Sequence, residues 1–163
     1  MFGRLYQFGY VTADLDAAVA ALRKRFGEFE VLIENREQQP GSAIRRAAKG
    51  YFGAMMLEII EPRAGIASVY SDSVPDRPDG LVLHHLGYAI DSEAEFADLR
   101  TWLREIGAEV VIEGDLPQLA YLYADLKAGL GHLHEYVWLK TAGRDFYAAV
   151  PRNAPRRAAT AAG

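Results

Sequence analysis

A short pattern that includes a candidate metal ligand occurs twice in this sequence, once in each half. Gln7–Tyr10 reads Gln-Phe-Gly-Tyr, and His85–Tyr88 reads His-Leu-Gly-Tyr. Each copy is followed, at almost the same separation, by a glutamate inside an apolar run: Glu58 in the first half and Glu135 in the second. Each half therefore has one metal-competent side chain near its start and another near its end. This arrangement predicts a duplicated module whose copies share one site.

The chemistry of these four side chains suits a cation. Alternate side chains of a strand share one face, and this rule places both glutamates among aliphatic neighbours, with no lysine or arginine on either short face. Burying a carboxylate there is costly unless a cation or hydrogen-bond donors hold it. A divalent ion bound by Gln7, Glu58, His85 and Glu135 satisfies both glutamates. Mixed nitrogen and oxygen ligands suit Zn, Ni, Co, Mn or Fe(II) without selecting among them.

Each of these residues, taken alone, has a simpler interpretation. Gln7 can be an ordinary polar residue of a strand, His85 can be a hydrogen-bonded core histidine, and the glutamates can face water at the mouth of a sheet. The correspondence between the two copies favours a joint site. The glycine two residues beyond Gln7 and beyond His85 is expected to leave space for a cavity. The remaining histidines are interpreted as surface or packing residues because they fall on the opposite strand face: His84, His132 and His134.

The elements that must position these residues follow the same order in both halves. Asp14 and Gly27 bound a helix with apolar residues at helical spacing. In the second half Ser92 and Glu95 form a capping box, and Gly107 closes the helix. The predicted strands are 5–11, 29–33, 42–51 and 54–60 in the first half, and 85–90, 109–113, 119–124 and 132–139 in the second.

These patterns predict an α+β fold built from paired βαβββ modules. The first module covers residues 1–64 and the second covers 81–140, with a turn-rich linker over 65–80. Residues 148–163 are rich in alanine, arginine and proline, and they are expected to form a mobile tail without a function.

The composition excludes several classes of protein. A chain of 163 residues that is 50% hydrophobic can bury a substantial core. The formal net charge of −4 argues against a nucleic-acid partner. The sequence has no run of about twenty apolar residues, so no membrane span is predicted. The N-terminus lacks the pattern of a signal peptide, and a cytoplasmic location is therefore expected. With no cysteine, neither a disulfide framework nor a thiolate site is available.

The repeat resembles the vicinal oxygen chelate superfamily, which includes glyoxalase I, methylmalonyl-CoA epimerase, extradiol dioxygenases and the bleomycin and fosfomycin resistance proteins. The resemblance rests on the paired modules, on residues 85–88, on Leu-Glu-Ile-Ile-Glu-Pro at 57–62 and on Gly-His-Leu-His-Glu-Tyr at 131–136. It implies a glyoxalase-like cleft formed by curled mixed sheets, with ligands on the first and last strands of each module. Those positions are Gln7, Glu58, His85 and Glu135.

The resemblance implies a divalent-metal-dependent isomerase or lyase that abstracts a proton next to a carbonyl. Glu135 is expected to be the general base and Glu58 its partner on the opposite face. The ligand set resembles that of eukaryotic-type glyoxalase I, whereas the amino-acid sequence of the strands is more similar to that of the epimerases. The expected partner is a small molecule, a thioester or a hemithioacetal, and a homodimer is an option. Two alternatives stay open: a metal-free binding protein of the bleomycin-resistance type, and a non-haem iron dioxygenase, which Gln7 disfavours.

Overall fold

A computed structural model describes residues 2–126 and 130–154 of the chain. The first half contains β1 (Arg4–Val11), α1 (Leu15–Phe26), β2 (Leu32–Asn35), β3 (Ile44–Phe52) and β4 (Met55–Pro62). A 3-10 turn, η1 (Ser71–Ser73), precedes the second half. The second half contains β5 (Val82–Ile90), α2 (Glu93–Glu105), β6 (Glu109–Asp115), β7 (Leu119–Asp125) and β8 (Leu133–Leu139). The segment after β8 forms α4 (Thr141–Ala148) and β9 (Arg152–Asn153).

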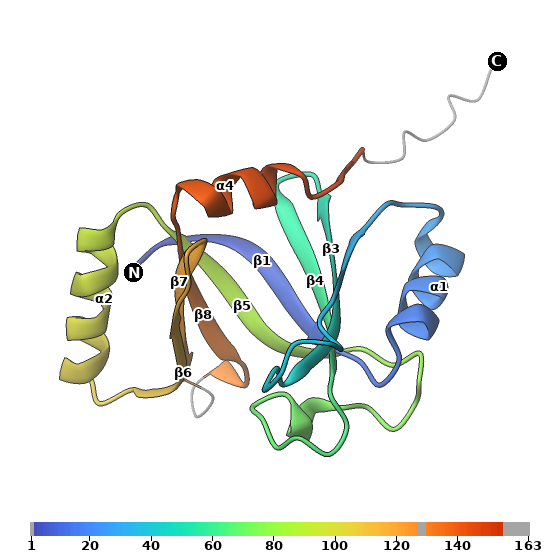
Figure 1. Ribbon diagram of the computed structural model, residues 1–163, viewed down its shortest axis with the longest axis horizontal. Coiled ribbons are helices and arrows are strands. Elements are labelled where there is room, and N and C mark those ends of the chain that lie inside the picture. Colours follow the sequence, from blue (N-terminus) through green and yellow to red (C-terminus); the bar gives the residue numbers. More distant parts are fainter. Residues whose placement is uncertain (1, 127–129, 155–163) are drawn as a thin grey trace.

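The strands of the described residues form one mixed sheet in which the two halves repeat each other. Its order is β2-β3-β4-β1-β5-β8-β7-β6, with β9 paired to the side of β3. Within each half the first strand runs parallel to the last, β1 with β4 and β5 with β8. The halves join where β1 and β5 pair antiparallel. Figure 1 shows the strands arching between α1 and α2, which lie on opposite outer sides. The predicted α+β fold with paired βαβββ modules is confirmed.

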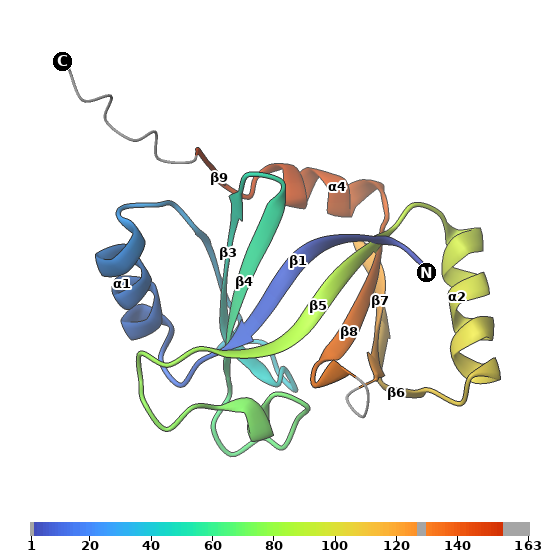
Figure 2. The same cartoon turned by 180° about the vertical axis from the view of Figure 1, so that it is seen from behind.

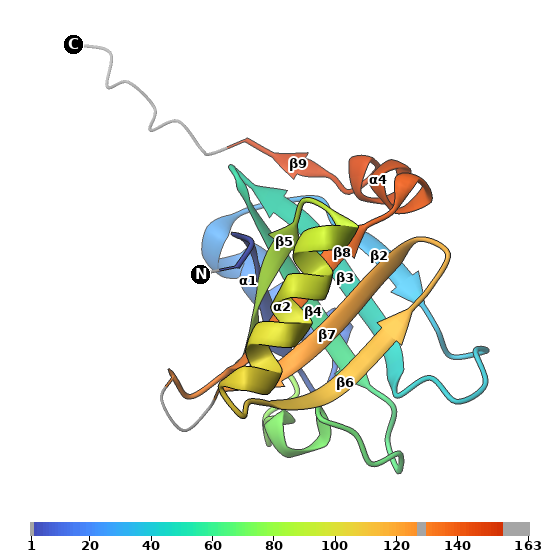
Figure 3. The same ribbon diagram turned by 90° about the vertical axis from the view of Figure 1, so that its left-hand side faces the viewer.

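Each helix packs on the outer face of its own half of the sheet. Figure 3 shows α2 lying across the strands of the second half, where Phe96, Leu99 and Leu103 are buried in an apolar cluster. In the first half Leu15 and Val19 of α1 belong to the equivalent cluster. Because α1 and α2 both cover the outer face, the inner, concave face remains available for the polar residues of the candidate site.

The helix starts follow from the capping residues seen in the sequence. The Asp14 side chain accepts hydrogen bonds from the backbone N–H groups of Asp16 and Ala17, and the Ser92 side chain accepts one from Glu95. Buried Glu61, at the end of β4, also accepts a hydrogen bond from the Leu15 N–H at 3.1 Å. These bonds satisfy N–H groups that the first turn leaves without partners, and so they fix where each helix leaves the sheet.

The structure differs from the expected elements in the second strand of the first half and in the segment that follows β8. The strand expected over 29–33 is β2 at Leu32–Asn35, because Phe29 packs into the core and its carbonyl accepts hydrogen bonds from Arg23. The mobile tail was expected from residue 148, yet Val150 is buried and β9 pairs with β3. Figure 2 shows α4 and β9 running along one end of the sheet. The rest of the expected tail, 155–163, lies outside the described residues.

The Asn153 side chain helps to anchor β9 to the first half of the sheet. Asn153 accepts a hydrogen bond from the Glu30 N–H at 2.8 Å, and it donates to the carbonyls of Glu30 and Tyr51 at 3.0 and 3.1 Å.

Among the residues that the structure describes, no helix is long and apolar enough to span a membrane.

Replacing Asn153 by alanine is expected to lower the free energy of unfolding by about 1–3 kcal/mol, because three backbone groups of the first half lose this partner. Urea unfolding followed by circular dichroism measures the change. Asn35→Ala is the matched control, since Asn35 accepts only the exposed Glu37 N–H among the described hydrogen bonds, and we expect it to change stability by about 0.5 kcal/mol or less. Equal effects of the two substitutions would contradict an anchoring role for Asn153.

Candidate metal centre

Four polar side chains meet on the concave face, one from each of the four central strands. The Gln7 Nε2 atom donates to Glu58 Oε2 at 2.7 Å and to Glu135 Oε2 at 3.2 Å, and it lies 3.0 Å from His85 Nε2. His85 Nε2 lies 3.4 Å from the same oxygen of each glutamate. Their exposed fractions are 1% for Gln7, 0% for His85, 7% for Glu58 and 9% for Glu135. The structure therefore brings together all four residues that the sequence singled out.

The register of the central strands explains why the four side chains converge. Gly9 of β1 lies between His85 on β5 and Glu58 on β4, and Gly87 of β5 lies between Gln7 on β1 and Glu135 on β8. A Cβ atom on Gly9 would lie 1.9 Å from the His85 ring, and one on Gly87 would lie 2.7 Å from the Gln7 Cβ. Each glycine therefore makes room for the ligand of the other module. The space expected beside each glycine is thus filled by a ligand side chain and does not form a cavity.

An irregularity in the pairing of β1 with β5 adds a second histidine to the site. Gly9 pairs with His85, but Tyr10 pairs with Leu83, so His84 is an extra residue in β5. Such a bulge interrupts strict alternation and can redirect a side chain. His84 is buried, and its Nδ1 lies 3.0 Å from the Nδ1 of His85. The placement of His84 on the strand face opposite to the ligands is therefore wrong, whereas its ring contacts with Tyr70 and Tyr123 agree with the interpretation as a packing residue.

The other two histidines lie where strand alternation predicts. The rings of His132 and His134 stack with centroids 5.2 Å apart, and His134 also lies against the ring of Tyr88, in the apolar surroundings of α2. Their interpretation as packing residues agrees with this position.

A buried lysine that the sequence patterns did not single out compensates the negative charge of Glu58. Lys49 of β3 is the register partner of Glu58 on the adjacent strand β4. Its Nζ atom lies 3.0 Å from Glu58 Oε1 and also contacts Glu34. Burial alone would lower the pKa of Lys49, but Glu58 and Glu34 hold that pKa above its usual value. Burial would raise the pKa of Glu58, but Lys49 and then His85 hold it well below its usual value. The available signal in the sequence was a lysine, which is a poor strand former, inside the strand predicted over 42–51.

The two glutamates favour the doubly protonated, cationic form of the His85 ring. Burial would lower the pKa of His85, but hydrogen bonding to Glu135 and Glu58 outweighs burial and raises it to about 9. The amide hydrogens of Gln7 and the proton of His85 together satisfy the two carboxylates. In this arrangement the Gln7 Oε1 atom is buried without a hydrogen-bond partner.

The same cluster fits a divalent cation. Among the described residues, one ligand atom from each of Glu58, His85 and Glu135 lies within 4.8 Å of the others. Turning the Gln7 amide by half a turn brings its unpartnered oxygen to the centre in place of the nitrogen, which supplies a fourth ligand. Two carboxylates, an imidazole and an amide oxygen form a mixed ligand set that suits Zn, Ni, Co, Mn or Fe(II). The metal role of these residues stays a prediction.

A small cleft of about 130 Å³ opens beside the cluster, and the segment after β8 closes part of it. Phe146 and Tyr147 of α4 lie on one side of the cleft, and Tyr121 and Tyr123 of β7 lie on another. The full lining is Glu34, Arg36, Ile44, Lys49, Glu58, Ile60, Tyr70, Leu116, Leu119, Tyr121, Tyr123, Glu135, Phe146 and Tyr147. Aromatic rings and paired charges therefore surround the two glutamates and limit their access to water.

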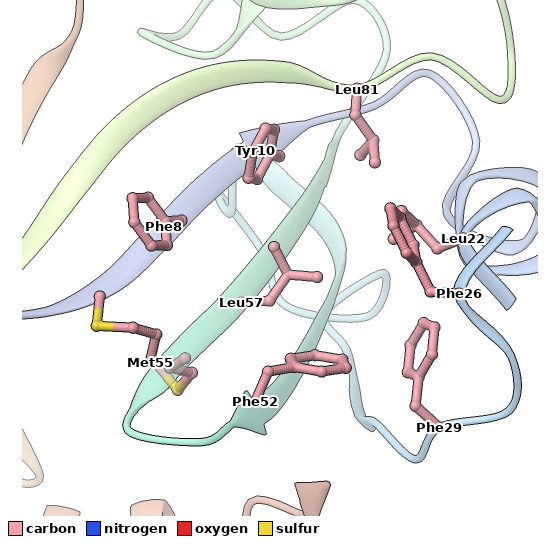
Figure 4. A pocket seen from close by; sticks show the side chains of 10 residues that line it. Phe8, Tyr10, Leu22, Phe26, Phe29, Phe52, Met55, Leu57 and Leu81 are labelled. Atoms are coloured by element: carbon pink, nitrogen blue, oxygen red, sulfur yellow. The ribbon is translucent and has the colours of Figure 1, made fainter. Parts of the chain in front are cut away.

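A larger cavity of about 490 Å³ lies elsewhere, between α1 and the outer face of the first half. Figure 4 shows its apolar lining, with Phe8 and Tyr10 from β1 facing Leu22 and Phe26 from α1. Phe8 and Tyr10 alternate with Gln7 and Gly9, so this cavity is on the side of the sheet opposite to the ligand cluster.

Gly9→Ala is expected to abolish metal binding and to destabilise the protein, because the new methyl group displaces the His85 ring. A double-mutant cycle checks this cause: in a His85→Ala background the ring is gone, so Gly9→Ala should then cost little additional stability. Thermal unfolding measures the stability of all four proteins, and titration with Co²⁺ measures binding. An equal cost of Gly9→Ala in both backgrounds would show that the clash is not with His85.

Metal binding is expected to tighten as the pH rises to about 9 and then to level off. The metal must displace a proton from His85, whose pKa is about 9, and competition with one proton weakens binding by about tenfold per pH unit below that value. Without metal, the same proton stabilises the fold: its contribution is complete below about pH 6.5 and is lost as the pH rises through about 9. Calorimetric titration with Co²⁺ in buffers of different ionisation enthalpy measures the released proton, and a pH-independent affinity would contradict the prediction.

Comparisons with known proteins agree on the fold. No family model matches the chain, and no curated protein matches it. A methylmalonyl-CoA epimerase from Mycobacterium tuberculosis is 21% identical, with a TM-score of 0.63 over 90% of this chain and 92% of that one. A variant of Streptomyces coelicolor methylmalonyl-CoA epimerase in complex with 2-nitronate-propionyl-CoA is 25% identical, with a TM-score of 0.60 over 86% and 100%. A methylmalonyl-CoA epimerase in complex with methylmalonyl-CoA and NH4+ is 25% identical, with a TM-score of 0.59 over 87% and 98%.

These solved structures are members of the superfamily that the repeated motifs resemble, and they match this chain over nearly all of its described length. The chain therefore has the fold of the vicinal oxygen chelate superfamily, and the resemblance predicted from its sequence is confirmed.

Proposed function

We propose that this protein is a divalent-metal-dependent enzyme that removes and returns a proton on the carbon next to a thioester carbonyl, as an acyl-CoA epimerase does. The observation that carries the proposal is the convergence of Glu58 and Glu135, from different modules, on one buried centre with Gln7 and His85. The structural similarity to methylmalonyl-CoA epimerases supports the same class of reaction.

Gln7, Glu58, His85 and Glu135 are the residues that would hold the cation. When bound, a divalent ion supplies a Lewis acid that stabilises negative charge on the carbonyl oxygen of an enolate. The two glutamate charges neutralise a divalent ion, and the amide and imidazole add no further charge. The aromatic rings that line the cleft limit the access of water to the glutamates, which strengthens the electrostatic interactions there.

The two glutamates are not equivalent, and the difference supports a separate role for each. Both oxygens of Glu58 have partners, because Oε1 contacts Lys49 and Oε2 accepts from Gln7. Glu135 makes its described contacts through Oε2 alone, with Gln7 and His85, and it lines the cleft. A general base must be free to approach the proton that it removes. This difference supports Glu135 as the general base and Glu58 as its partner on the opposite face of the substrate.

A thioester is the substrate class that the comparisons favour, since two of the solved structures contain acyl-CoA compounds. A hemithioacetal, as used by glyoxalase I, requires the same proton abstraction and is the nearest alternative. The metal-free binding protein and the iron dioxygenase predicted as alternatives are outcomes of the same experiment. A binding protein would catalyse no exchange with solvent, and a dioxygenase would consume oxygen.

Glu135→Gln is expected to lower the rate of α-proton exchange by roughly a hundred- to ten-thousand-fold, because an amide cannot accept the proton. Exchange is measured by NMR as deuterium incorporation from D2O into acyl-CoA thioesters, with hemithioacetals screened in parallel and the protein loaded with Co²⁺ or Zn²⁺. Glu109→Gln is the control, since Glu109 is exposed on β6, and it should keep full activity. Exchange by Glu135→Gln at the wild-type rate would exclude Glu135 as the base.

A further inference from the structure

We infer that His84 is a positioning residue that, together with the backbone carbonyl of Val69, fixes which ring nitrogen of His85 faces the metal. The inference rests on the proposed function, because it concerns a ligand of the proposed metal centre. It adds a residue that lies outside the four-ligand set, and it gives a chemical role to the segment between the modules.

The hydrogen bonds along this chain of groups have a direction. His84 Nε2 lies 3.0 Å from the carbonyl oxygen of Val69. A carbonyl can only accept, so this nitrogen of His84 carries the hydrogen. In a neutral imidazole the other nitrogen is then bare, and His84 Nδ1 becomes an acceptor. It lies 3.0 Å from His85 Nδ1, which must therefore donate.

The consequence falls on the opposite nitrogen of His85. Once Nδ1 of His85 holds a hydrogen for His84, the neutral ring has its lone pair on Nε2. That Nε2 atom is the one that faces Gln7, Glu58 and Glu135. Metal-bound histidines usually donate their other ring N–H to a fixed acceptor, which selects the tautomer and holds the ring in position. Here a second histidine is the acceptor, and a backbone carbonyl fixes that histidine in turn.

The bulge in β5 is the feature that makes this arrangement available. Regular alternation would send the side chains of His84 and His85 to opposite faces. The extra residue at position 84 lets both rings lie on the same side, where they meet at an interplanar angle of 86°. The ring of Tyr70, which follows Val69, packs against His84 at 4.9 Å. The segment over 65–80, expected to be only a linker, therefore supplies both the carbonyl and the ring that hold His84.

The first test locates the hydrogens. The chain contains four histidines, so long-range proton–nitrogen NMR spectra of protein labelled with ¹⁵N-histidine can resolve each ring. In the zinc-loaded protein His84 is expected to carry its hydrogen on Nε2 and to have a bare Nδ1. A hydrogen on Nδ1 of His84 in that protein would overturn the inference.

The second test measures zinc affinity by competition with a chromogenic chelator. His84→Phe keeps an aromatic ring beside Tyr70 but removes the acceptor, and it is expected to weaken zinc binding by roughly ten- to a hundredfold. His84→Asn places an amide oxygen near the position of Nδ1, so it should recover a large part of the loss. His132→Phe is the matched control, because the Nε2 atom of His132 has no hydrogen-bond partner to lose, and its affinity should equal that of the wild type.

The outcomes separate this inference from the proposed function. Zinc binding by the wild type that is unchanged in His84→Phe overturns the role of His84 and leaves the metal centre intact. Equal weakening in His84→Phe and His132→Phe also overturns it, because general destabilisation then explains both. A wild-type protein that binds neither zinc nor cobalt overturns the proposed metal centre itself, and the role of His84 with it.

Discussion

The site depends on the close pairing of β1 with β5, in which each strand uses a glycine where the other carries a ligand. A side chain as large as imidazole can cross a neighbouring strand only where that strand has no Cβ, and Gly9 meets this condition for His85. Gly87 does the same for Gln7. Because β4 and β8 lie on the outer sides of this pair, their glutamates reach the same point. The duplication therefore creates more than similar halves, since each half supplies the space that the other needs.

Burying two carboxylates at one point is expensive, and the surrounding residues show how the chain compensates. Lys49 neutralises part of the charge on Glu58, and the proton of His85 lies between both glutamates. A metal ion would replace that proton, while Lys49 would stay. Either a proton on His85 or a bound cation would thus compensate the charge of the two carboxylates, which is the condition for reversible metal binding at neutral pH.

The sequence predicted the residues that repeat and missed those that do not. Gln7, Glu58, His85 and Glu135 were found because two copies of one pattern can be compared with each other. Lys49 has no counterpart in the other half, and its cross-strand contact with Glu58 depends on a register that periodicity alone does not give. His84 was assigned to the wrong face because a bulge breaks the alternation on which that assignment relied. Long-range hydrogen bonds of Asn153 help to hold β9 against the first half. No local pattern in a segment rich in alanine and arginine predicts such bonds.

The contact between Lys49 and Glu58 also limits the chemistry of the proposed reaction. Removing a proton and returning it to the same face of an enolate needs one base, which is the role proposed for Glu135. Inversion at the carbon needs a second group that can give a proton from the other side. Glu58 is the group proposed for that side, but Lys49 stabilises its ionised form and so makes a proton on it less available. The stereochemistry of the product, more than the occurrence of exchange, therefore distinguishes an epimerase from an isomerase that uses a single base.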